Sequence, residues 1–169
     1  SATKEELLNL LIIKLHIHKL CKSYQEYYSF INNEFSKLDT ILGSDMIYQS
    51  IKCGEIEVLY PDNNDAIKYL ESYISLLKEQ NMLKSKLGLG ALYELAELYT
   101  KNKEYLKAIS INEQSLSLIQ ELYGKQSVSY IVELNLLATK YLTLGNYNTY
   151  FKLQKDMFEI INQYYGKNS

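Results

Sequence analysis

The sequence predicts an all-α protein of about eight helices, stacked as antiparallel pairs. The 169 residues contain only 7 Gly and 1 Pro, too few for the many tight turns of an all-β chain. Apolar residues recur at spacings of three and four along nearly the whole chain, and no credible strand run is present. The length suits a single domain, residues 1–169, that can bury a sizeable core.

Capping signals and polar breaks separate the predicted helices. Residues 3–6 (Thr-Lys-Glu-Glu) have capping-box spacing, and Gly43-Ser44-Asp45 predicts a break followed by an N-cap. The segment 60–65 (Tyr-Pro-Asp-Asn-Asn-Asp) is the strongest turn signal. Helices are therefore expected at about 3–21, 23–38, 45–59, 65–80, 84–100, 103–123, 127–144 and 146–165.

An internal repeat of 42 residues is the most informative feature. When the chain is shifted by 42 positions, many residues coincide: Leu92 with Leu134, Leu95 with Leu137, Ala96 with Ala138, Tyr99 with Tyr141, Tyr105 with Tyr147, and Tyr123-Gly124 with Tyr165-Gly166. One step earlier the match is weaker, with Gly54 on Ala96 and Ala66 on Ala108. Each unit is then two antiparallel helices and a turn. We expect the small residues, Gly54 included, to let neighbouring helices approach closely.

This pattern resembles the tetratricopeptide repeat, in the 42-residue form of kinesin light chains. The residues that carry the resemblance are Leu134-Asn135-Leu136-Leu137-Ala138, Tyr141, Gly145-Asn146-Tyr147 and Tyr165-Gly166, with a similar run from Leu92 to Ala108. The resemblance implies a right-handed superhelical array, an α-solenoid. Its units would be a degenerate helix pair at 1–42, a degenerate repeat at 43–82, and clear repeats at 83–124 and 125–166.

In such arrays the first helix of each unit lines a groove that binds an extended or helical peptide. The resemblance places these residues in the groove: Ile51, Glu55, Tyr93, Glu97, Lys101, Asn135 and Thr139, with Val132 and Leu142 as apolar neighbours. Related arrays that hold the C-terminal carboxylate of heat-shock chaperones use Lys and Asn where this chain has Tyr93 and Glu97, so that partner is not expected. The groove suits a neutral or mildly basic peptide with aromatic or aliphatic anchors.

Three function classes stay open. The leading one is a non-catalytic protein–protein interaction scaffold. The second is the sensor part of a bacterial peptide-sensing regulator, and binding of a short peptide at micromolar strength without other proteins would favour it. The third is the C-terminal accessory region of a SET-and-MYND-type methyltransferase, although the methyltransferase motifs are absent from this chain. The sequence flanking the domain in the full gene would separate the three.

The residues predict no catalytic, metal or cofactor site. On a helix, His16 and His18 point about 200° apart, and His18 with Cys21 supplies two ligands where zinc needs three or four. Gly88-Leu89-Gly90 resembles a fragment of a phosphate loop, but it has no preceding strand and no following Lys-Ser/Thr pair. We interpret it as a helix start that permits close helix approach. We expect no enzyme.

Composition narrows the partners and the compartment. All 18 basic residues are Lys, and the absence of Arg argues against nucleic-acid recognition. The longest apolar run, residues 10–13, is far shorter than the roughly 20 residues of a membrane span. Two Cys make no disulfide framework and favour a reducing compartment, so we expect a cytoplasmic protein. The excess of Lys, Asn and Tyr is typical of an AT-rich genome.

The 17 Tyr divide into two groups. Four occupy repeat positions and are expected to pack between helices: Tyr99, Tyr105, Tyr141 and Tyr147. A larger group is not explained by the repeat: Tyr24, Tyr27, Tyr28, Tyr48, Tyr69, Tyr73, Tyr93, Tyr130, Tyr150 and Tyr164. We expect part of this second group to be exposed and available to a partner.

Overall fold

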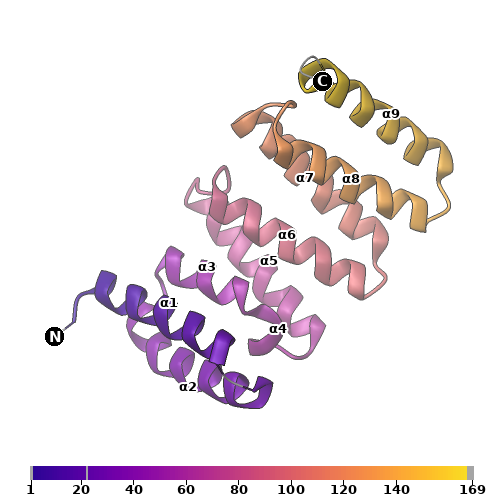
Figure 1. Ribbon diagram of the computed structural model, residues 1–169. Coiled ribbons are helices and arrows are strands. Elements are labelled where there is room, and N and C mark those ends of the chain that lie inside the picture. The colour runs from indigo at the N-terminus through magenta and orange to yellow at the C-terminus, as the bar shows by residue number, and fades with distance from the viewer. Residues whose placement is uncertain (1, 22, 167–169) are drawn as a thin grey trace. The chain divides into compact units, whose positions relative to one another are not determined.

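The computed structural model describes residues 2–21 and 23–166, except the side chains of Cys21 and Tyr24. Within these residues the fold is entirely helical, with no strand, which confirms the predicted all-α class (Figure 1). The described helices are α1 (Lys4–Cys21), α2 (Tyr24–Leu42), α3 (Met46–Gly54), α4 (Ile56–Leu59), α5 (Asn63–Glu79), α6 (Lys86–Lys101), α7 (Tyr105–Tyr123), α8 (Val128–Thr143) and α9 (Tyr147–Tyr164). None of them is long and apolar enough to cross a bilayer.

The chain divides into two compact units, Ser1–Tyr69 and Leu70–Ser169, here called unit 1 and unit 2. In unit 1, α1 and α2 bury the faces that their periodicity predicts. The core contains Leu8, Leu11 and Leu15 of α1, Tyr27, Ile31, Phe35 and Leu42 of α2, Tyr48 of α3 and Val58 of α4. The capping box at Thr3 and Glu6 is present, with both reciprocal hydrogen bonds, and Asp45 caps α3.

The third predicted helix is interrupted at Glu55, so the expectation of one helix up to Leu59 was wrong. The Glu55 carboxylate is buried, where it accepts a hydrogen bond from the Tyr27 hydroxyl at 2.7 Å and pairs with Lys19 Nζ at 2.6 Å. These partners lie 28 and 36 residues away in the sequence, so no local pattern announces them. Gly54 does not mediate close helix approach either, because a Cβ built on it meets nothing within 4 Å.

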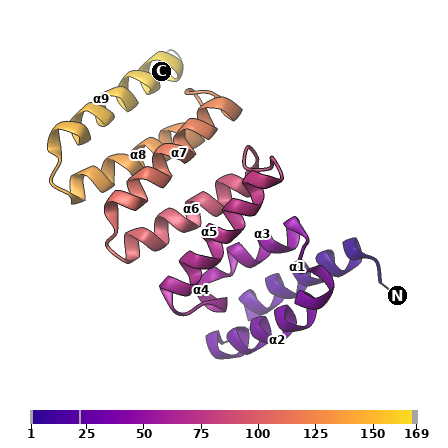
Figure 2. The ribbon, with the colours of Figure 1, turned by 180° about the vertical axis from the view of Figure 1, so that it is seen from behind.

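In unit 2, helices α6, α7, α8 and α9 follow one another as antiparallel neighbours, visible from both sides in Figures 1 and 2. All four begin and end within two residues of the predicted ranges. α8 lies between α7 and α9: its buried Tyr130 and Leu134 contact Ile119 of α7 on one side, and on the other Leu153, Met157 and Ile160 of α9.

The 42-residue repeat is visible in the contacts of unit 2. The Tyr99 hydroxyl donates to the Glu71 carboxylate, and 42 residues later the Tyr141 hydroxyl donates to Glu113 Oε1 at 3.2 Å. Ala96, Ala108 and Ala138 are all buried, as close helix crossings require. Tyr147 is an exception, since it is largely exposed and does not pack between helices as expected.

Candidate binding face

Seven of the nine predicted groove residues lie on α6 and α8 of unit 2 and leave all or part of their side chains accessible. We call this set the α6/α8 face. It consists of Tyr93, Glu97 and Lys101 on α6, and Val132, Asn135, Thr139 and Leu142 on α8. The spacing of each set, four and four on α6 and three, four and three on α8, places its members along one side of a helix.

The opposite sides of the two helices hold this face in position. α6 buries Leu92, Leu95 and Ala96, and its first turn is capped by Ser85, whose Oγ accepts a hydrogen bond from the Gly88 amide at 3.3 Å. α8 buries the residues 42 positions later, Leu134, Leu137 and Ala138, and is capped by Ser127. The same apolar pattern thus fixes the rotation of both helices, and the opposite side stays accessible.

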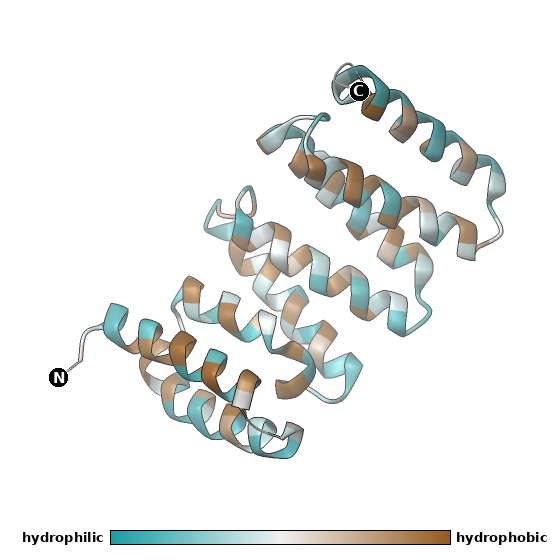
Figure 3. Cartoon of the chain, in the orientation of Figure 1, coloured by the Kyte–Doolittle hydropathy of each residue, from teal (hydrophilic) through white to brown (hydrophobic). Residues whose placement is uncertain are grey.

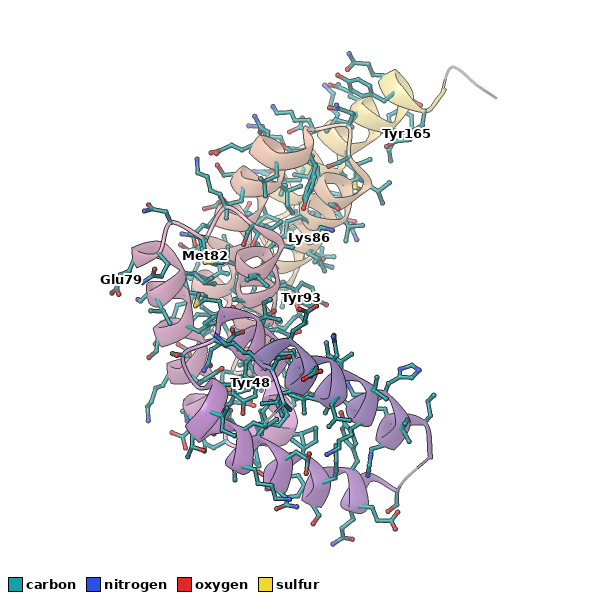
Figure 4. The ribbon with its side chains drawn as sticks, turned by 90° about the vertical axis from the view of Figure 1, so that its left-hand side faces the viewer. Tyr48, Glu79, Met82, Lys86, Tyr93 and Tyr165 are labelled. Carbon is teal, nitrogen blue, oxygen red and sulfur yellow. The ribbon has the colours of Figure 1, made fainter. Side chains whose placement is uncertain are left out.

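Tyr93 is the aromatic residue of the face. Its side chain projects from α6 (Figure 4) and is 45% exposed. The negative charge of Glu97 raises the pKa of the Tyr93 phenol, with smaller effects from burial and from the carboxylates of Glu94 and Glu133. A phenol ring in a field of carboxylates favours a cationic or amide-bearing ligand over an anionic one.

A partly buried ion pair connects the two helices at the face. Lys140 Nζ on α8 lies 3.6 Å from Glu97 Oε1 on α6, and the Lys140 side chain is almost completely buried. Glu133, 5% exposed, accepts a hydrogen bond from Asn112 Nδ2 of α7 at 2.6 Å. Burial raises the pKa of the Glu133 carboxyl, against the opposing effects of Asn112 and of the nearby Lys140 charge. Lys140 therefore faces two carboxylates, one half-exposed and one buried.

Asn112, Ser115, Glu133 and Lys140 form a buried polar cluster that the sequence analysis did not single out. Among the described residues, Asn112 Oδ1 and Ser115 Oγ have no hydrogen-bond partner. Buried polar atoms without a hydrogen-bond partner are costly in free energy.

The repeat itself carried the signal for this cluster. Shifted back by 42 residues, the four positions hold Leu70, Tyr73, Ala91 and Leu98, all buried and mostly apolar. A position-by-position comparison of the three successive repeats, looking for polar residues at buried positions, would have found all four residues.

Asn135 and Thr139 are already engaged within unit 2. The Thr139 hydroxyl donates to the Asn135 carbonyl oxygen at 2.6 Å, and Gln154 Nε2 of α9 donates to Asn135 Oδ1 at 3.5 Å. Asn135 is exposed, and its side-chain amide can donate to a peptide carbonyl.

The other two predicted groove residues belong to unit 1 and have structural roles there. Ile51 packs against the core of that unit. Glu55 is bound to Lys19 and Tyr27 as described above, so its carboxylate is not available to a ligand.

The remaining sequence candidates are also accounted for. The His18 ring stacks on Phe30 with centroids 3.7 Å apart, and its Nδ1 lies 2.9 Å from the Lys14 carbonyl oxygen. The Cys21 side chain, its suggested metal-binding companion, lies outside the described residues. In the unexplained Tyr group, Tyr28, Tyr93 and Tyr164 are exposed, whereas Tyr27, Tyr48, Tyr73 and Tyr130 are buried. The Tyr24 side chain also lies outside the described residues.

Stacked helix pairs with a regular repeat and an accessible face on the first helices define a helical-repeat solenoid, a class that binds other proteins. Comparisons with known proteins indicate which kind of helical repeat this is. Residues 89–149 match the tetratricopeptide repeat. No curated protein matches the sequence significantly. The chain therefore has a tetratricopeptide-like helical repeat fold.

Solved structures support the same fold over almost the whole chain. The chain is similar to the nearly identical TPR-like repeats of a protein designated a kinesin light chain from Podosopora anserina. That match has a TM-score of 0.72 at 15% identity and covers 94% of this chain and 75% of that one. A single-substitution variant of the same protein matches with a TM-score of 0.65 at 15% identity, covering 92% and 85% of the two chains. Repeats of this type generally bind proteins and are typically non-catalytic.

Proposed function

We propose that this protein is a non-catalytic interaction scaffold and that the α6/α8 face of unit 2 binds an extended peptide. The observation that carries the proposal is the exposed Tyr93 ring beside Glu97, with exposed Val132 and Leu142 on the neighbouring first helix. An aromatic ring with a polar tip next to apolar side chains is the composition of an interface anchor. Because two Cys make no disulfide framework, the proposal includes a reducing compartment, the cytoplasm.

The charges of the face define the class of peptide. The carboxylates of Glu97 and Glu94, together with the buried one of Glu133, raise the pKa of the Tyr93 phenol, and the Lys140 side chain is nearly buried. An acidic peptide tail would meet these carboxylates, whereas a Lys or Arg side chain can lie over the Tyr93 ring with its charge toward Glu97. The partner we propose is therefore a neutral or mildly basic segment with aromatic or aliphatic anchors.

Peptide-array binding tests the proposal. The Tyr93→Ala/Glu97→Lys double variant should lose binding of basic peptides that the unmodified protein retains. Glu97→Gln is a milder second variant, because it keeps a hydrogen-bonding group next to Lys140. Tyr123→Ala is the matched control, since Tyr123 is an exposed Tyr on α7 and is not one of the face residues. Unchanged binding in the double variant would move the binding site off the α6/α8 face.

A further inference from the structure

The buried polar cluster of unit 2 contains two charged residues, Glu133 and Lys140, which both belong to α8 and are each 5% exposed. Figure 3 shows hydrophilic residues among the hydrophobic ones along this helix. Charged side chains are almost never fully buried unless they are paired, because the loss of hydration is costly. A buried ion pair is also often no more stable than an apolar pair of similar volume. Packing alone therefore does not account for these two charges.

The contacts of the two residues join three helices. Glu133 accepts a hydrogen bond from Asn112 Nδ2 of α7 at 2.6 Å, which holds its carboxylate inside the cluster. Lys140 Nζ lies 3.6 Å from Glu97 Oε1 of α6, and the Glu97 side chain is 34% exposed. The buried ammonium group is therefore paired with a carboxylate that is also accessible from the α6/α8 face.

The repeat shows that an accessible carboxylate at this position is particular to α6. The residue equivalent to Glu97 is Glu55 in the preceding repeat and Thr139 in the following one. Glu55 is 7% exposed, and its carboxylate is bonded to Lys19 and Tyr27. Thr139 carries no charge. Of these three residues, Glu97 is the one that presents an accessible negative charge.

The charges near Tyr93 act on one another across the α6/α8 face. The pKa of the Tyr93 phenol is raised most by Glu97, then by burial and by Glu94. Glu133 raises this pKa further, and Lys101 lowers it. The charge of Glu133 therefore acts at the accessible surface, although the Glu133 side chain itself is buried.

These charges nearly cancel, so one buried charge changes their balance. The groups that act on Tyr93 or pair with Glu97 comprise three carboxylates and two ammonium groups: Glu94, Glu97, Glu133, Lys101 and Lys140. With Glu133 ionised, this set carries one net negative charge, and with Glu133 protonated it carries none. Buried charges are screened by salt much less than exposed ones. An ionised Glu133 therefore favours a cationic ligand at the face.

We propose that Glu133 and Lys140 set the charge specificity of the α6/α8 face without touching the peptide. Glu133 is a specificity-determining residue, because its carboxylate supplies the surplus negative charge that favours a basic peptide over a neutral one. Lys140 is a positioning residue, which holds the Glu97 carboxylate and partly neutralises it. This inference rests on the proposed peptide-binding function and names the residues that decide which peptides the face prefers.

Paired peptides measure this specificity by fluorescence anisotropy. The probes are a labelled basic peptide without His, selected on the peptide array, and a twin in which Gln replaces each Lys or Arg. The preference is the dissociation constant of the twin divided by that of the basic peptide. In Glu133→Gln the preference should fall about two- to fivefold at low salt. Gln keeps the oxygen that accepts from Asn112, and a change in packing would weaken both peptides alike.

A second variant tests the role of Lys140. The double variant Glu133→Gln/Lys140→Met should regain the preference that Glu133→Gln loses, because Glu97 then has no ammonium group to neutralise it. Met retains most of the apolar stem of Lys. Glu121→Gln is the matched control, since it removes an exposed carboxylate that pairs with Lys84 and is not one of the face residues. It should leave the preference unchanged.

A pH profile separates the charge of Glu133 from its packing. Around Glu133, α6 contributes Glu97 and Tyr93, α7 contributes Asn112, and α8 contributes Lys140. Burial raises the pKa of the Glu133 carboxyl, Asn112 and Lys140 oppose this effect, and Glu97 adds to it. The preference should therefore rise as pH increases through that raised pKa in the unmodified protein, and this rise should be missing in Glu133→Gln. All other titratable groups are the same in both proteins, so the difference between the profiles reports Glu133.

The outcomes distinguish this inference from the proposed function. If Glu133→Gln weakens both peptides equally, or if the two pH profiles run parallel, the inference is wrong and the proposed function stands. A double variant that stays at the level of Glu133→Gln would overturn the role of Lys140. If the unmodified protein binds no peptide of the array, the proposed function fails and this inference fails with it.

Discussion

Alanine substitutions at the two glycines of Gly88-Leu89-Gly90 should have opposite effects on stability. A Cβ added to Gly88 would lie 2.0 Å from the Leu83 carbonyl oxygen and 2.7 Å from its carbon, whereas a Cβ on Gly90 would meet nothing within 4 Å. Both positions lie in α6, two residues apart. The close approach expected at this motif is therefore real at Gly88, but it is made to the chain's own preceding turn and not to a neighbouring helix.

The magnitude follows from the geometry. Ordinary van der Waals contact begins at about 3.4 Å, so Gly88→Ala forces the Leu83 backbone to move by more than an ångström. Overpacking of this kind costs about 1–3 kcal/mol. Replacing Gly by Ala inside a helix gains about 1 kcal/mol, and this gain applies fully to Gly90→Ala. Because both variants share the propensity gain, Gly88→Ala should be less stable than Gly90→Ala by about 1–3 kcal/mol.

Urea unfolding followed by circular dichroism measures this difference directly. In thermal scans, Gly88→Ala should melt about 2–12 °C below Gly90→Ala, at 2–4 °C per kcal/mol for a chain of this length. A phosphate loop would behave differently, since a bound nucleotide would raise the melting temperature of the unmodified protein. Equal stability of the two variants would refute the packing explanation.

Two further predictions follow from buried residues of unit 2. Ala96→Phe should destabilise the protein by about 1–3 kcal/mol in urea unfolding, because Ala96 is buried at a helix crossing, and a neutral result would remove Ala96 from that crossing. Glu133→Gln should change how stability depends on pH. The pKa of Glu133 is raised in the folded protein, so its contribution is most favourable below the ordinary pKa of Glu and declines as pH rises through the folded value. Relative to the unmodified protein, the variant should therefore gain stability between pH 4 and pH 8, and parallel curves over that range would contradict the assignment.

How well the fold was predicted differs between the two halves of the chain. In unit 2 the Leu-x-x-Leu-Ala pattern and its 42-residue repetition located α6 to α9 within two residues. In unit 1 the predicted second helix ended four residues early, at 38 instead of Leu42. α5 began two residues earlier than expected, because Asp62 Oδ1 accepts the Asn64 amide at 2.7 Å and caps the helix.

The candidate face was predictable in part. Helical periodicity was enough to predict that Tyr93 and Val132 are exposed, because the buried side of each helix determines which side remains open. Periodicity did not predict the burial of Glu55 or of Lys140. The Glu55 carboxylate is bonded to Lys19 and Tyr27, and Lys140 is buried although Lys is usually exposed. In both cases the deciding partner comes from a different helix.

The scarcity of Gly and Pro, the helical spacing and the repeat period by themselves determined that this chain forms stacked helix pairs. The spacing is set within each single helix, and the repeat applies the same local pattern to successive pairs. Only the tertiary structure decided which polar residues are buried and which apolar residues are open. The cluster around Glu133 and Lys140 forms because three helices meet there, and Phe151 and Phe158 of α9 are exposed because no helix within the described residues covers them. Burial depends on neighbours distant in sequence, and a local pattern does not contain them.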